Sequence, residues 1–75
     1  MVRFESALKK AKKLKPNIDN CREFTDAYVF ASHEDEYSFG GDGPVVVLKD
    51  SGKAINMVDY TQTSSGAELI RELEL

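Results

Sequence analysis

The chain is poor in the residue types that build disulfides and metal centres. Its 75 residues include one cysteine, one histidine and no tryptophan. A lone cysteine excludes an intrachain disulfide, and with it the disulfide-stapled scaffolds of small secreted proteins. A single histidine argues against a zinc site, which usually draws on several imidazoles or thiolates. The fold must therefore depend on its own hydrophobic core or on association.

Long hydrophobic runs are also absent. No apolar stretch approaches the ~20 residues of a membrane-spanning helix, and residues 1–5 lead into a lysine-rich stretch rather than an apolar signal-peptide core. We therefore expect a cytoplasmic protein without membrane contact. A hydrophobic fraction of 41% and a charged fraction of 31% are typical of a globular chain. The length allows one domain, residues 1–75, whose core would supply only ~3–5 kcal/mol of net stability.

Charge is distributed unevenly along the chain. Residues 1–16 contain six Lys or Arg and one Glu, whereas residues 17–75 contain four basic and twelve acidic side chains. The net charge of −3 therefore hides a basic N-terminal segment that precedes an acidic body.

The most informative segment is the apolar run Val45–Lys49, which follows a glycine-rich stretch and a proline. A half-buried strand alternates apolar and polar residues, whereas this run fills both faces. Strand alternation predicts that Val45 and Val47 share an outward face with Lys49, while the two intervening residues point inward. A chain this short has little material to cover two apolar sheet faces. We expect a second helix, a partner protein or a second copy of the chain to cover one of them.

Periodicity and turn residues predict the order of the elements. Apolar residues at helical spacing indicate a helix over residues 3–14 that ends before Pro16. The glycine within Asp50–Lys53 indicates a hairpin turn, and a capping-box pattern at Ser65–Glu68 predicts a short helix over 66–73. The expected strands are 20–24, 27–33, 45–49 and 54–60. The fold class is α+β: an N-terminal helix packed on a three- or four-stranded antiparallel sheet, with a short C-terminal helix.

No group of residues has the spacing of a catalytic, metal or cofactor site. Cys21 and His33 are the types needed for a thiol nucleophile and its base, but no residue at a recognisable spacing would orient the pair. The run from His33 to Glu36, with Asp42, could offer oxygen ligands to a cation. It lacks the ligand alternation of a calcium loop, so a solvated acidic loop is the simpler interpretation. We predict a protein that is not an enzyme and that binds no cofactor or metal.

The loop between the second and third expected strands carries the residues most typical of a protein interface. Aromatic anchors ringed by charge are common in interface hot spots. An acidic surface favours a basic partner, such as a nuclease or another protein that handles nucleic acid. The residues expected to contact this partner are two aromatic and four acidic ones: Tyr37, Phe39, Glu34, Asp35, Glu36 and Asp42.

The basic helix supports a second hypothesis, in which the chain is a nucleic-acid-binding accessory. Its lysines could follow a phosphate backbone and release counterions. Arginine is scarce, however, no aromatic residue interleaves the lysines, and the acidic body would oppose close approach. A solvated helix face is the competing interpretation. The residues concerned are Lys9, Lys10, Lys12, Lys13 and Lys15.

Several segments together resemble small bacterial immunity proteins. The aromatic strand Tyr28–Phe30 is followed by a polar loop, the segment Gly40–Pro44, the valine run, Lys49 and the turn glycine Gly52. This pattern is similar to that of α+β proteins that neutralise toxins of interbacterial competition. The size and charge character are similar to those of phage-encoded inhibitors of bacterial defence, anti-CRISPR proteins among them. The resemblance implies a non-catalytic binder that acts by occlusion.

Overall fold

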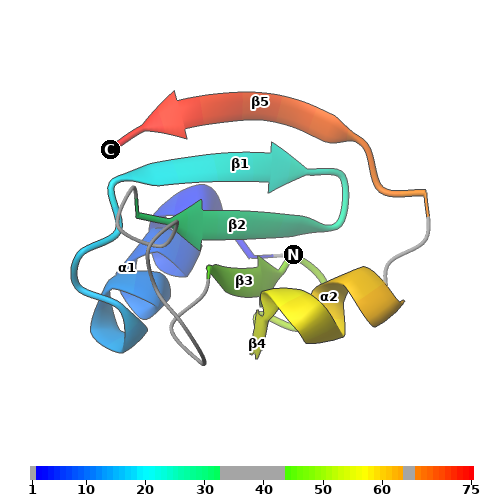
Figure 1. The fold of residues 1–75 in the computed structure, drawn as a ribbon, viewed down its shortest axis with the longest axis horizontal. Helices are drawn as coiled ribbons and strands as arrows, with labels where there is room; N and C mark the ends of the chain where they lie inside the picture. Colours follow the sequence, from blue (N-terminus) through cyan, green and yellow to red (C-terminus); the bar gives the residue numbers. More distant parts are fainter. Residues whose placement is uncertain (1, 33–43, 64–65) are drawn as a thin grey trace.

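The computed structural model describes residues 2–32, 44–63 and 66–75. In chain order the elements are α1 (Phe4–Leu14), β1 (Asn20–Phe24), β2 (Ala27–Ala31), β3 (Val45–Leu48), β4 (Ala54–Asn56), α2 (Met57–Thr63) and β5 (Leu69–Glu74) (Figure 1). The predicted α+β class, with an N-terminal helix on an antiparallel sheet and one further short helix, is confirmed, but the sheet has five strands rather than three or four and the second helix precedes the last strand. The helices of the described ranges lack the length and the hydropathy that a membrane span requires.

The five strands pair in the order β4-β3-β2-β1-β5, each antiparallel to its neighbours. β1 and β2 form a hairpin in which Cys21 lies opposite Phe30. β5 returns to the far side of β1 and brings Leu73 opposite Cys21. β1 is therefore an inner strand, and β4 and β5 form the two edges of the sheet (Figure 1).

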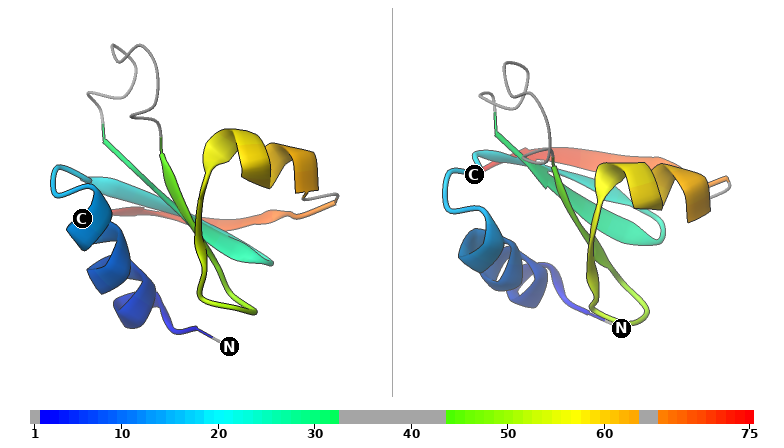
Figure 2. Two further views of the ribbon diagram at one scale, coloured as in Figure 1. Left: turned by 90° about the horizontal axis from the view of Figure 1, so that it is seen from below. Right: turned by 60° about the horizontal axis from the view of Figure 1, so that its bottom comes forward.

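Helix α1 covers one face of the sheet (Figure 2). Ala7 and Ala11 are completely buried, and their small side chains let the helix lie close to the strands. The Phe4 ring packs edge-on against Tyr28, with centroids 5.7 Å apart, and lies 6.0 Å from Phe30. This core also contains Ile18, Cys21 and Val47, with Val2, Leu8, Val45 and Leu73 partly buried at its margin.

Helix α2 packs on the opposite face (Figure 2). Tyr60 places its ring 6.0 Å from that of Phe24, and its hydroxyl donates a hydrogen bond to Asp26 Oδ1 at 2.6 Å. The rest of this second core consists of Ala27, Val29 and Val46, with Leu48, Ile55 and Met57 partly buried. Because β3 contributes valines to both cores, the prediction that this run is covered on two sides is confirmed.

The segment 54–60, which the sequence predicts as one strand, divides into two elements. β4 ends at Asn56 and α2 begins at Met57. The Asn56 Oδ1 accepts a hydrogen bond from the backbone N–H of Asp59 at 2.7 Å, which is the interaction that an N-cap residue makes. The strand prediction over 57–60 is therefore wrong. The apolar residues of this segment favour a strand, whereas an asparagine followed three residues later by an aspartate is typical of the start of a helix.

The predicted helix over 66–73 is also wrong, because residues 69–74 form β5. Leu69, Ile70 and Leu73 have helical spacing, and the intervening Arg and Glu are good helix formers. Without β5, however, the outer edge of β1 would lack its hydrogen-bonding partner, and pairing there outweighs weak local propensity. Gly66, with φ of +81°, directs the chain into the strand.

Lys49, predicted to point outward, is buried, with its side chain 5% exposed. Its Nζ donates to Glu23 Oε2 at 2.7 Å and lies 4.9 Å from the centroid of the Tyr28 ring. Arg71 Nε donates to the other oxygen of Glu23, also at 2.7 Å. Alternation correctly groups Lys49 with two valines of β3, but that face lies beneath α1. The two hydrogen bonds, Lys49 first and Arg71 second, hold the pKa of Glu23 below its ordinary value.

The hairpin turn between β3 and β4 depends on Gly52. Its φ is +72°, and a Cβ there would lie 2.8 Å from Cγ2 of Val2. We expect Gly52→Ala to lower the free energy of unfolding by about 2 kcal/mol, because left-handed strain and this overlap add. Urea unfolding followed by circular dichroism measures the loss.

Gly66→Ala is the matched control for this substitution. Gly66 also has a positive φ, +81°, but a Cβ there would meet no atom within 4 Å. Gly66→Ala therefore measures the cost of backbone strain alone, and we expect it to lower the free energy of unfolding by about 1 kcal/mol. Equal losses for the two variants would contradict the contribution of the Val2 contact.

Candidate functional site

The α2 side of the sheet carries an exposed apolar strip along β5. Leu69 and Ile70 are 49% and 53% exposed. Leu69 pairs with Phe24, which packs against the α2-side core, at a register shift where β5 carries one extra residue, Ile70. Ile70 precedes Arg71, whose guanidinium lies 6.0 Å from the Phe4 ring on the α1 side. Strand alternation from Arg71 directs Ile70 to the α2 side, and the extra residue at the register shift, as in a β-bulge, lets Leu69 face the same side.

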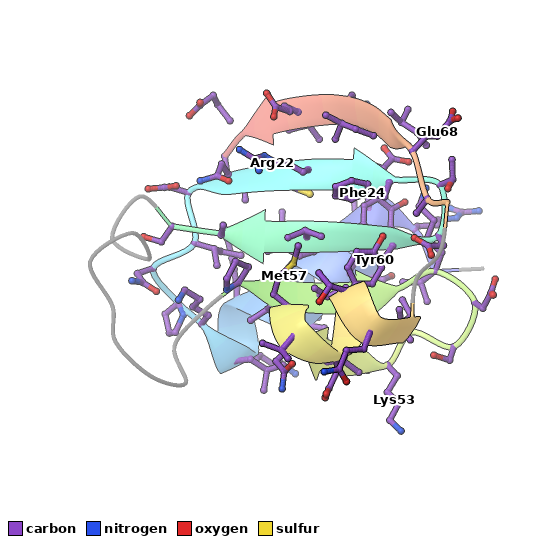
Figure 3. The ribbon with its side chains drawn as sticks, turned by 45° about the vertical axis from the view of Figure 1, so that its right-hand side comes forward. Arg22, Phe24, Lys53, Met57, Tyr60 and Glu68 are labelled. Atoms are coloured by element: carbon purple, nitrogen blue, oxygen red, sulfur yellow. The ribbon has the colours of Figure 1, made fainter. Side chains whose placement is uncertain are left out.

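A groove of about 620 Å³ lies on the sheet between β5 and the start of α2. Val29, Ala31 and Met57 contribute apolar surface to it. Figure 3 shows Arg22 and Met57 on the same side of the sheet as Phe24 and Tyr60, with α2 lying in front of β3. The remaining lining residues are Asn20, Cys21, Arg22, Ser32, Pro44, Glu72, Leu73 and Glu74.

The charge along this surface is mainly acidic. Arg22 forms an ion pair with Glu72, Nε to Oε1 3.0 Å, in which both side chains are more than half exposed. Such surface pairs contribute little to stability. Glu68 and Glu74 are exposed and make no ion pair with any residue that the structure describes. The surface thus combines half-exposed aliphatic side chains with surplus carboxylates.

The outer edge of β5 is a further part of this surface. Leu75 donates its backbone N–H to Asp19, and Thr25 donates to Glu68, so these groups join β5 to β1. Because successive residues of a strand direct their backbone groups to opposite sides, Glu72 and Glu74 direct theirs away from β1. Among the described strands none pairs with that side.

The sequence-predicted interface residues Tyr37, Phe39, Glu34, Asp35, Glu36 and Asp42 lie outside the described residues. The segment that contains them joins Ser32 to Pro44, and both of these residues line the groove. The predicted contact surface and the groove are therefore adjacent in the chain.

The structure separates the five lysines of the second hypothesis. Lys9, Lys12 and Lys13 are exposed on α1, on the face of the sheet opposite the groove. Lys10 donates a hydrogen bond to the Gly52 carbonyl, and Lys15 is buried. Three of the five lysines thus present their charge to solvent without an ion pair to a described residue.

Cys21 lies in the α1-side core and is completely buried. Burial, and secondarily the charge of Glu23, raise the pKa of the thiol to about 11. Thiolate is therefore scarce at neutral pH, and the side chain behaves as a small apolar group. His33 lies outside the described residues. In the part of the chain that the structure describes, acidic, histidine and cysteine side chains form no group that could hold a metal ion.

Comparison with known proteins identifies no relative: no protein-family model, curated protein or solved structure matches the chain. The groove and the β5 strip are features that sequence reasoning missed, because they depend on β5 being a strand. One signal was available. Leu69-Ile70 follows Gly66 and precedes Arg71-Glu72-Leu73-Glu74, in which three of four residues are charged, and charged side chains are common on exposed edge strands.

Proposed function

We propose that this chain is a non-catalytic binding module that acts by covering a surface of another protein. The observation that carries the proposal is the open part of the α2-side sheet face, where Leu69 and Ile70 are half exposed on the same strand whose residues 72–74 line the groove. Apolar side chains next to a concave surface and ringed by charge have the anatomy of an interface. The first hypothesis from the sequence, a binder that acts by occlusion, requires such a surface.

The charge of this surface favours a basic partner. Glu68 and Glu74 add negative charge to the described surface and make no ion pair with a described residue. The sequence between Ser32 and Pro44 contains four more acidic residues together with Tyr37 and Phe39. Complementary charge would steer a basic partner, such as a nuclease or a defence effector that handles nucleic acid. We propose an inhibitory or immunity-like role in the cytoplasm.

A nucleic-acid accessory role is the second candidate. The observation that favours it is the exposed ridge of Lys9, Lys12 and Lys13 on α1. It is the weaker candidate because only three charges are free to contact phosphates, and binding strength falls steeply when few phosphates are neutralised.

The two candidates are separated by substitutions on opposite faces. We expect Ile70→Lys to weaken binding to a protein retained from native cells by about tenfold, because it adds an unpaired charge at an apolar contact. The matched control is Val58→Lys on α2, which changes another exposed aliphatic residue, one that lies outside β5. Binding to each variant is measured by quantitative affinity capture and then by titration of the retained protein.

A double variant, Lys9→Glu with Lys13→Glu, tests the α1 surface in the same assay. The proposal expects it to bind like the wild-type chain. The proposal is overturned if Ile70→Lys and Val58→Lys behave alike. It is also overturned if the wild-type chain retards DNA or RNA fragments at low salt and the double variant does not.

A further inference from the structure

We propose that the outer edge of β5 binds an extended basic segment of the partner as a sixth strand of the sheet. This inference rests on the proposed function and specifies how the partner binds. Strand addition at an open edge is a common mode of peptide recognition, in which backbone hydrogen bonds supply affinity and alternating side chains supply selectivity.

The two edges of the sheet differ in their capacity to accept another strand. β4 contains three residues, and the chain enters α2 directly after Asn56. β5 contains six residues, and no described strand lies beyond it. Short strands and covering elements are the usual means by which proteins close a sheet edge. By this criterion the β4 edge is closed and the β5 edge is open.

The backbone groups that an added strand needs are those of Glu72 and Glu74. The hydrogen bond from Leu75 N–H to Asp19 sets the pattern for residues 71–75, C-terminal to the register shift, in which the odd-numbered residues bond to β1. Arg71 and Leu73, which lie opposite residues of β1, share that direction. The N–H and carbonyl groups of Glu72 and Glu74 therefore face the open side, next to the exposed side chain of Ile70.

The charges of β5 disfavour a second copy of the chain as the occupant. Two copies that pair through their β5 edges would be related by a two-fold axis perpendicular to the sheet, and each residue would lie opposite a residue of the other copy on the same face. If the axis passes at Glu72 or at Arg71, that residue lies opposite its own copy. If the axis passes at Leu73, Glu72 lies opposite Glu74 of the other copy. Like charges that lie directly opposite are destabilising, so each of these registers is penalised.

The same charges favour a basic strand. On the α2 side of β5, Glu72 and Glu74 alternate with Leu73, which points into the α1-side core. Arg71 is already bonded to Glu23. Glu72 has only its exposed pair with Arg22, and Glu74 makes no ion pair with a described residue. An added strand with Lys or Arg at alternate positions would place cations opposite these carboxylates, and apolar residues near Ile70 would cover its exposed surface.

The test uses the full chain and two synthetic peptides of about ten residues, long enough to pair with all six residues of β5. One alternates Lys with Val and Thr, and the other has Glu in place of each Lys. We expect the basic peptide to slow amide hydrogen exchange of Glu72 and Glu74 by about tenfold or more. The amides of Arg71 and Leu73, which already bond to β1, should change little. The acidic peptide should have no effect.

Glu72→Pro removes the outward N–H, and proline is tolerated on an edge strand at such a position. Glu72→Thr is the matched control, because it removes the same carboxylate but keeps the N–H. We expect the proline variant to bind the basic peptide about tenfold more weakly than the threonine variant. If circular dichroism shows that Glu72→Pro does not fold, Glu74→Pro makes the same test one hydrogen-bonding position further along.

Several results would overturn the inference. They are equal binding by the proline and threonine variants, protection by the acidic peptide, and the absence of protection by either peptide. Protection of Glu72 and Glu74 that rises with protein concentration alone would identify a second copy as the occupant. If a captured partner depends on Ile70 but is indifferent to Glu72→Pro, the proposed function stands and strand addition fails.

Discussion

Glu23→Gln is expected to lower the free energy of unfolding by about 3 kcal/mol at pH 7. The carboxylate of Glu23 accepts hydrogen bonds from Lys49 and Arg71, and the Lys49 side chain is 5% exposed. Removing one partner of a buried ion pair leaves the other charge uncompensated, which costs about 3–5 kcal/mol. The exposed position of Arg71 places the expected loss at the lower end of this range. Urea unfolding followed by circular dichroism measures it.

The loss is expected to depend on pH in a defined direction. The pKa of Glu23 is lower in the folded chain than the ordinary value of 4.5. A carboxyl of this kind stabilises the fold fully above its unfolded pKa, and the contribution disappears as pH falls through the folded pKa. The difference between the wild-type chain and Glu23→Gln should therefore be constant near neutral pH and shrink below about pH 4.5.

The control for this prediction is Glu72→Gln. Glu72 also pairs with an arginine, but both side chains are largely exposed, so the expected loss is below about 1 kcal/mol. A Glu23→Gln variant as stable as Glu72→Gln, or a difference from wild type that grows as the solution is acidified, would contradict the role assigned to the buried network.

Phe30→Ala is expected to leave the chain largely unfolded at 25 °C. Phe30 is completely buried in the centre of the α1-side core and lies 6.0 Å from the Phe4 ring. Truncating a buried phenylalanine costs about 3–5 kcal/mol, which equals the whole stability expected of a core of this size. The far-ultraviolet circular dichroism spectrum and the urea midpoint measure the loss.

Two milder variants keep this prediction testable if Phe30→Ala cannot be purified. Phe30→Leu should fold with a loss of about 1–2 kcal/mol, because most of the apolar volume is kept. Leu14→Ala, at a side chain 60% exposed at the end of α1, should change stability by less than about 0.5 kcal/mol. Similar losses at Phe30 and Leu14 would show that α1 is not anchored through this core.

The elements that the sequence predicts correctly are those in which local pattern and tertiary environment agree. The stripe of α1, the aromatic strand β2 and the valine run of β3 each carry a periodicity that their burial satisfies. The turn at Gly52 follows from the need for positive φ. For these segments, the local sequence is sufficient to predict the secondary structure.

The errors occur where long-range pairing decides the outcome. Residues 69–74 carry helical spacing, but their partner is β1, whose residues lie about fifty positions earlier. Nothing local to Leu69 or Ile70 reports that an unpaired strand edge is available there. The groove and the β5 strip cannot be predicted from the sequence for the same reason, because both depend on residues 69–74 forming a strand beside β1. The predicted contact residues Tyr37 and Phe39 lie outside the described residues and stay a prediction.

The position of β1 between β2 and β5 has a consequence for biosynthesis. β2 follows β1 within a few residues, but β5 emerges only after α2. Until β5 has been synthesised and has paired, the outer backbone groups of β1 lack their final partner. Contacts of such high sequence separation slow folding, and bare strand edges expose nascent chains to aggregation.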